Sequence, residues 1–324
     1  MSDNDGLVHA YVLDGNGGGK KIGWSEIRTW SEVDGTLWVH LDYSSPESIA
    51  WLEEESGLDE VVVSALISED PRPRSALMFD GLLVMLRGVN MNPGADPEDM
   101  VSMRLWINDK RIISTRRRKI LSVQDISRSI ERGDGPTSSA EFLVSITDRL
   151  VERMADVVND IEDKAGILED EILIVQSHQL RPQISELRRE AINLRRYLAP
   201  QREAMTRLYS ERVPWLNDIQ RMQLREIADS TMRYIEELDS ARERAIVIQE
   251  ELMSRISEQM DKRMYVLSMV AAIFLPLGFL TGLLGINVGG IPGAEYQGSF
   301  LIFCFILVVL VGAQIWIFRK MKWF

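Results

Sequence analysis

Gly285, Ile286 and Asn287 stand at the end of a long run of uncharged residues. This run covers residues 264–287, about 24 positions, enough for a helix to cross a hydrocarbon layer roughly 30 Å thick. A second uncharged run, 299–318, follows a short loop rich in glycine. The carboxamide of Asn287 can accept hydrogen bonds from the water shell of a cation. The pattern therefore predicts a polar side chain at the mouth of a membrane helix.

Helical spacing back from Asn287 defines one face of the first span. The positions on this face are Gly282, Gly278, Leu275, Ala271, Leu267 and Met264, and the next turn reaches Asp261. A narrow apolar lining can exclude ions by dewetting, whereas glycine and alanine leave room for hydrated ones. The glycines would equally allow close helix packing, so both interpretations stay open. Two spans cannot enclose a water-filled path, so a pore would need several copies of the chain.

Other groups capable of chemistry are few. Neither span contains Asp, Glu, His, Lys or Arg, so no side chain offers a proton relay at membrane depth. Asp261 is a candidate inner ring of charge, and Glu295, in the outer loop, could gather cations or simply be solvated. His9, His40 and His178 share no metal-ligand spacing, and Cys304 is expected to be a packing residue. We find no nucleophile or cofactor-binding loop, so we expect neither an enzyme nor a cofactor.

The distribution of charge sets the expected topology. Lys262 and Arg263 precede the first span and Arg319 and Lys320 follow the second, while the loop between the spans has no basic residue. Both termini are therefore predicted to lie in the cytoplasm. The formal charge of −12 argues against binding to nucleic acid and favours cations as partners. The amino terminus lacks the basic and apolar segments of a signal peptide.

The remaining sequence predicts a soluble α+β domain with a mainly antiparallel sheet, residues 1–136, and a helical stalk, residues 137–263. Residues 264–324 form the predicted membrane domain. Strands are expected at 7–13, 22–24, 36–41, 76–79, 82–89, 100–107 and 111–115, with helices from Pro46 and over 60–67. The basic run 116–119 is expected to be solvated or paired with acids. Pro182 and Pro200 are expected to break or kink the stalk, and Pro214 to start a helix of about 70 residues.

Taken together, these features resemble the CorA metal-ion transporters over essentially the whole chain. The matching features are the Gly-x-Asn at 285–287, the two carboxy-terminal spans, the long preceding helix, the acidic α/β domain, and the segments 274–277 and 281–282. Ile286 departs from the usual Gly-Met-Asn. With the following Val-Gly-Gly-Ile-Pro-Gly at 288–293 and the segment 112–118, it is similar to the ZntB branch, which moves zinc.

The resemblance implies a funnel-shaped homopentamer in the bacterial inner membrane, with the first spans lining the pore and a ring of Asn287 side chains as the outer filter. It implies zinc uptake, with Co²⁺, Ni²⁺ and Cd²⁺ as further cargo, and proton-coupled transport is expected of this branch. Two alternatives stay open. One is a CorA-like channel for Mg²⁺ and cobalt, gated by metal between cytoplasmic domains. The other is a membrane-anchored coiled-coil scaffold that conducts nothing.

Overall fold

The computed structural model describes residues 5–172, 180–286, 291, 293 and 295–320. The chain divides into two compact units, Met1–Gln249 and Glu250–Phe324. The first unit holds a sheet with its covering helices, and the second holds two apolar helical segments. Asn287 and His178 lie outside the described residues.

A seven-stranded sheet forms the centre of the first unit, in the order β2-β1-β3-β7-β6-β5-β4. The strands are β1 Leu7–Leu13, β2 Gly19–Lys21, β3 Thr36–Asp42, β4 Arg74–Met78, β5 Gly81–Gly88, β6 Val101–Ile107 and β7 Arg111–Arg116. The β3–β7 pair is parallel, and every other neighbouring pair is antiparallel. This confirms the prediction of a mainly antiparallel sheet.

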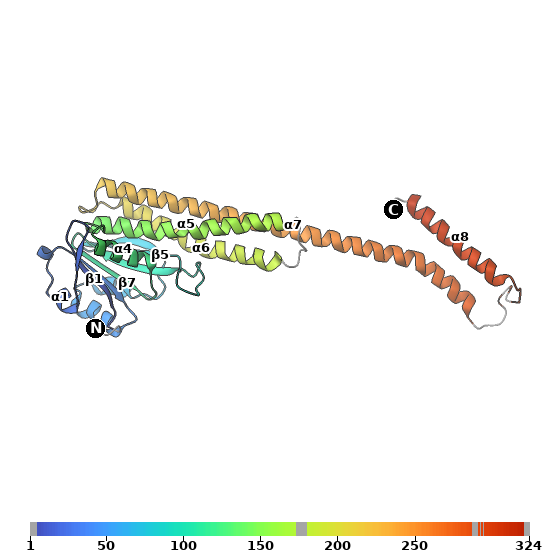
Figure 1. Cartoon of the computed structure of the whole chain (residues 1–324), viewed down its shortest axis with the longest axis horizontal. Helices are drawn as coiled ribbons and strands as arrows, with labels where there is room; N and C mark the ends of the chain where they lie inside the picture. Colours follow the sequence, from blue (N-terminus) through green and yellow to red (C-terminus); the bar gives the residue numbers. More distant parts are fainter. Residues whose placement is uncertain (1–4, 173–179, 287–290, 292, 294, 321–324) are drawn as a thin grey trace. The chain divides into compact units, whose positions relative to one another are not determined.

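Both faces of the sheet are covered, which explains its nearly continuous apolar strands. On one face Tyr11, Trp38 and Leu105 pack into a core with residues of helices α4 Leu121–Arg132, α5 Ser139–Glu171 and α6 Leu180–Ser210. On the other face, Val39 and Trp106 pack with shorter helical segments. These are α1 Trp24–Thr29, the π-helical turn η2 Trp51–Glu55 and α3 Glu60–Leu66. The short helix α2 Pro46–Ala50 and the 3-10 turn η1 Glu32–Asp34 lie in the connections between these elements. Figure 1 shows α1 and α5 on opposite sides of the strands.

Three stalk helices follow the sheet. Helix α7, Asp218–Gly285, contains 68 residues, and its first part packs in the same unit as α5 and α6. Arg244 of α7 donates two hydrogen bonds of 2.7 Å to Glu169 of α5. Arg195 of α6 pairs with Asp239 of α7 at 2.6 Å. These ion pairs flank the apolar contacts and fix the register of the three helices.

Several predicted boundaries were wrong. The second strand lies at 19–21 and not at 22–24, because Asp14 Oδ1 accepts from the N–H groups of Asn16 (2.7 Å) and Gly18 (3.0 Å) and tightens the turn. Helix α4 was not predicted. Pro182 lies in the first turn of α6, where its missing N–H breaks no helical bond, and Pro200 lies inside α6 without ending it.

Helix α7 starts at Asp218 and not at Pro214. Asn217 and Gln220 form a reciprocal cap there: each side-chain oxygen accepts a 3.0 Å hydrogen bond from the other residue's backbone N–H. Such a cap satisfies two donors that the first helical turn leaves free. It decides the start more strongly than the proline four residues earlier.

Candidate metal pathway

The second unit contains two helical segments that are long and apolar enough to cross a membrane, by length and composition alone. They are the end of α7 and helix α8, Ser299–Lys320, and no residue of either apolar window is fully buried within the described chain. An apolar surface of this extent is unfavourable in water and favourable in lipid. The two predicted spans are therefore present as helices.

Pro276 lies inside α7, where proline cannot donate a hydrogen bond to the carbonyl of Ala272. Gln314 of α8 supplies the missing donor: its Nε2 lies 3.3 Å from the oxygen of Ala272. In lipid an unsatisfied carbonyl is costly, so this contact completes the backbone hydrogen bonding at the proline. It also fixes where α8 lies against α7 within this unit. The sequence alone gave no reason to pair these two positions.

One face of α7 packs against α8. The residues on this face that are half-buried are Met269, Ala272, Ile273, Pro276, Leu277 and Leu280. The predicted pore-facing residues are all exposed within the single chain: Met264, Leu267, Ala271, Leu275, Gly278 and Gly282. At about 100° per residue the two sets centre on opposite sides of the helix. Most of the predicted register therefore lies on the side of α7 away from α8, while Gly278 lines a groove with Leu307 and Val311 of α8.

The glycines of this face leave open space. A Cβ atom added at Gly278, Gly282 or Gly285 would meet no atom within 4 Å. Packing among the described residues therefore does not explain why glycine occupies these positions. Either close approach by another copy or room for a hydrated ion would explain it.

Two of the predicted residues, Asp261 and Gly285, lie at the two ends of this stretch of α7. Gly285 is the last residue of α7, and Ile286 follows it with half of its surface exposed. Asn287, the predicted filter, lies outside the described residues. Glu295 is exposed in the turn before α8, and Asp261 is exposed on α7 one turn before the apolar stretch. Lys262, the neighbour of Asp261, pairs with Glu258 at 3.6 Å.

Sheet pairing brings together two histidines that sequence spacing did not connect. His9 and His40 are partners across β1 and β3, with ring centroids 6.1 Å apart. Ser114 Oγ lies 2.8 Å from His40 Nδ1, and Ser127 Oγ lies 3.3 Å from His9 Nδ1. Burial lowers the pKa of His9 to about 4 and holds the pKa of His40 well below its usual value. Both rings are therefore neutral at pH 7.

These histidines do not make a metal centre. Within the described part of the chain, no group of three or more His, Cys, Asp or Glu side chains is placed to hold a metal ion. Zinc held tightly by protein usually has four such ligands, or three and a water. The pair fits a structural role in the sheet. Cys304 is half-buried in α8, beside apolar neighbours in the sequence.

Comparison with known proteins extends over nearly the whole chain. Residues 33–320 match the family described as CorA-like Mg²⁺ transporter protein. Zinc transport protein ZntB of Pectobacterium carotovorum is 40% identical, covering 99% of this chain and 97% of its own length. Divalent cation transporter CmaX of Pseudomonas aeruginosa is 39% identical, over 99% of this chain and 98% of its own. The solved structure of full-length CmaX superposes with a TM-score of 0.86 at 38% identity, covering 100% of both chains.

Proposed function

Because this chain belongs to the CorA family of metal-ion transporters, we propose that it carries zinc into the cytoplasm through a pore lined by α7 of several copies. Membership of this family makes the protein a divalent cation transporter and not an enzyme. Zinc is the favoured cargo because relatives about 40% identical over nearly their full length are named zinc transport proteins. Co²⁺, Ni²⁺ and Cd²⁺ are proposed as secondary cargo.

The free face of α7 is the observation that carries this proposal. Helix α8 covers one side of α7, and the side that bears Ala271, Leu275 and Gly282 is exposed. We propose that five copies turn this side toward a common axis in a funnel-shaped homopentamer. A ring of Asn287 would then form the outer filter, next to Gly285 and Ile286. Asp261 would form an inner ring, and Glu295 would lie at the outer mouth.

The chemistry of this lining favours an ion that keeps its water. The proposed register from Met264 to Gly282 offers no thiolate, imidazole or carboxylate, which are the ligands that bind zinc tightly. Asn287 would accept hydrogen bonds from the ion's water shell and so select by size and geometry. A divalent cation gains about 4.6 kcal/mol per 100 mV of inside-negative potential, twice the value for one charge. This field can drive entry without another energy source.

Proton coupling would need groups outside the spans. Asp261 and Glu295 are the titratable residues of the proposed pathway that lie nearest to its ends. We place the protein in the bacterial inner membrane with both termini in the cytoplasm. The absence of basic residues from the loop at 288–298 supports that orientation.

A channel for Mg²⁺ and cobalt is the second candidate. Two findings favour it: the matching family is described as CorA-like Mg²⁺ transporter protein, and CmaX is named a divalent cation transporter without a specified metal. Ile286 argues for zinc, since it replaces the methionine of the usual Gly-Met-Asn. The two candidates differ in cargo and share the same pathway.

The test uses purified full-length protein in sealed liposomes that hold a zinc-sensitive or a magnesium-sensitive dye. Zinc entry that accelerates with external acid and is lost in Asn287→Ala would support the coupled zinc transporter. Gln297→Ala is the matched control, because this carboxamide is exposed in the outer segment and lies off the α7 register. Magnesium entry indifferent to pH would favour the channel. No flux of either metal would refute transport and favour the scaffold.

A further inference from the structure

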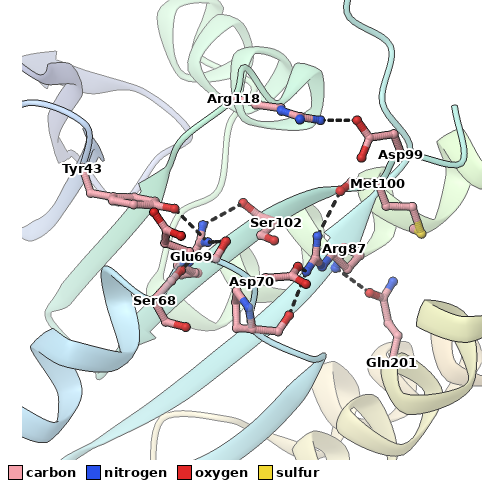
Figure 2. A network of polar contacts seen from close by, with 12 residues as sticks. Tyr43, Ser68, Glu69, Asp70, Arg87, Asp99, Met100, Ser102, Arg118 and Gln201 are labelled. Carbon is pink, nitrogen blue, oxygen red and sulfur yellow. Dashed lines mark hydrogen bonds and ion pairs between the residues drawn. The ribbon is translucent and has the colours of Figure 1, made fainter. Parts of the chain in front are cut away.

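A charged pocket lies at the junction of the sheet and α6, in the first unit. It has a volume of about 340 Å³ and is lined by the end of β5, the start of β6, the segment before β4 and the basic run after β7. Its charged lining consists of Arg87, Arg104, Arg117, Arg118, Glu69, Asp70 and Asp99. Four guanidinium groups thus face three carboxylates. Figure 2 shows Arg87, Asp70, Asp99 and Arg118 around this space.

Arg104 forms part of the floor of the pocket, and no carboxylate of the described residues forms an ion pair with its guanidinium. The residue is 1% exposed and stacks on the ring of Tyr43, 4.7 Å from the ring centre. Its guanidinium donates to the carbonyls of Ser68 (2.8 Å) and Glu69 (3.0 Å) and to the hydroxyl of Tyr43 (3.1 Å). Burial lowers its pKa, and the charge of Arg87 lowers it further. A buried cation held only by neutral oxygens is costly, and an anion would relieve that cost.

Arg87 is the second buried guanidinium of the pocket. Its side chain is 6% exposed and lies 4.5 Å from the ring centre of Tyr197 on α6. It pairs with Asp70 and donates to the carbonyls of Met100 (3.0 Å) and Pro71 (3.1 Å). Its Nε is buried and has no hydrogen-bond partner among the residues that the structure describes. Buried donors are usually paired in folded proteins, so this N–H is a donor that a ligand in the pocket could satisfy.

The rim of the pocket can exchange its partners at low cost. Arg117 pairs with Glu69 at 3.3 Å, and Arg118 pairs with Asp99. All four side chains are more than half exposed, at 58%, 81%, 55% and 62%. Exposed ion pairs contribute only about 0–1 kcal/mol. A dianion in the pocket could therefore bind Arg117 and Arg118 in place of the two carboxylates, which would become solvated.

We propose that this pocket binds a phosphate oxyanion, either free phosphate or the phosphoryl group of a larger metabolite. Guanidinium forks bind phosphate oxygens through paired hydrogen bonds, and here several forks converge on one small space. A phosphate dianion carries more charge than each rim carboxylate that it would displace. The site is independent of the metal pathway and uses the basic run that the transport function leaves unexplained. Because Tyr197 lines it, occupancy would also stiffen the contact between the sheet and α6.

The test is titration calorimetry on full-length protein in detergent micelles, in a buffer free of phosphate. Inorganic phosphate is the first probe and ATP the second. The variant Arg117→Gln/Arg118→Gln should bind phosphate at least about tenfold more weakly, the effect of losing a charge-assisted contact. The matched control is Arg128→Gln/Arg132→Gln, which removes two exposed arginines that also pair with acids outside the pocket. It should bind as the unmodified protein does.

A second variant should change the affinity for phosphate in the opposite direction. Glu69→Gln/Asp99→Asn removes the competing carboxylates and should bind phosphate at least about threefold more tightly. Tighter binding of ATP than of phosphate would identify a nucleotide phosphoryl group as the ligand, and equal or weaker binding would identify the free ion. The proposal is refuted if millimolar phosphate does not bind, if the control loses as much affinity as the rim variant, or if removing the acids weakens binding.

Discussion

The hydrogen bond between Gln314 and the carbonyl of Ala272 gives a sharp test of the packing of α7 against α8. Pro276 removes the helical donor for that carbonyl, and Gln314 Nε2 replaces it at 3.3 Å. The contribution of Gln314 should therefore depend on the proline. A cycle of Gln314→Leu, Pro276→Ala and the double variant isolates this dependence.

The expected magnitude follows from the geometry. Hydrogen bonds between membrane helices contribute about 0.6 kcal/mol on average and up to about 1.7 kcal/mol. The Oε1 atom of Gln314 is buried without a partner among the described residues, so leucine relieves a cost as well as removing a bond. We therefore expect Gln314→Leu to cost about 1 kcal/mol of unfolding free energy, roughly fivefold in the equilibrium constant. In the Pro276→Ala background the alanine N–H can bond Ala272, and the same substitution should cost close to nothing.

The assay is reversible unfolding of the full-length protein in mixed micelles with increasing dodecyl sulfate, followed by circular dichroism. Unfolding free energies for the four proteins give the coupling directly. Costs that add, with Gln314→Leu equally damaging with and without Pro276, would refute the assigned role of Gln314. A larger cost in the alanine background would refute it as well.

Three further outcomes are expected. Burial lowers the pKa of His9 to about 4, so the unfolded chain binds the proton more tightly than the folded chain does. The free energy of unfolding should therefore be highest above pH 6.5 and fall by about 2 kcal/mol as the pH drops from 6.5 toward 4. Thermal melts should show a smaller loss in His9→Asn. Gln201→Leu should lower the free energy of unfolding by about 1–3 kcal/mol, because Gln201 Oε1 accepts a 2.6 Å hydrogen bond from the buried backbone N–H of Arg87. The control Gln183→Leu, at an exposed position of the same helix, should leave the melting temperature unchanged. Asp261→Asn should slow zinc entry into liposomes several-fold at low salt and less at high salt, and Glu258→Gln, which loses a paired acid, serves as its control.

Local signals were sufficient for much of the fold. The alternation of apolar residues predicted β1, β3 and β6 to within about two residues, and charge-free length predicted α8, because these signals depend on neighbours in sequence. Helix α4 was not predicted because its buried positions include serines, such as Ser122 and Ser129, which weaken the apolar pattern. The prediction of a helix break at Pro200 was wrong, because a helix that packs on other helices can tolerate an internal proline.

Contacts between distant segments could not be predicted. The pairing of His9 with His40, the bond from Gln314 to Ala272, and the placement of Arg87 beside Tyr197 all join residues that are far apart in sequence. The helical register of the proposed pore stays a prediction, which uses only the period of one helix and a polar end point at Asn287. The basic run 116–119 was expected to be solvated or paired with acids, and Arg116, Arg117 and Arg118 do pair with acids. The pocket that two buried arginines form with this run could be recognised only once the order of the strands in the sheet was known.

The distribution of charge along the proposed pathway bears on how zinc could be selected. Tight zinc ligands in the span would hold the ion, and a pathway must release its ion as readily as it admits it. The register from Met264 to Gly282 avoids such ligands altogether, while charge appears at Asp261 and Glu295, where water screens it. Attraction at the ends and a neutral lining between them would give fast passage with modest discrimination among divalent ions. Discrimination among divalent ions would then depend on the diameter of the ring formed by Asn287 and its neighbour Ile286. We therefore expect Ile286→Met, and not a change of charge, to shift the preference toward magnesium.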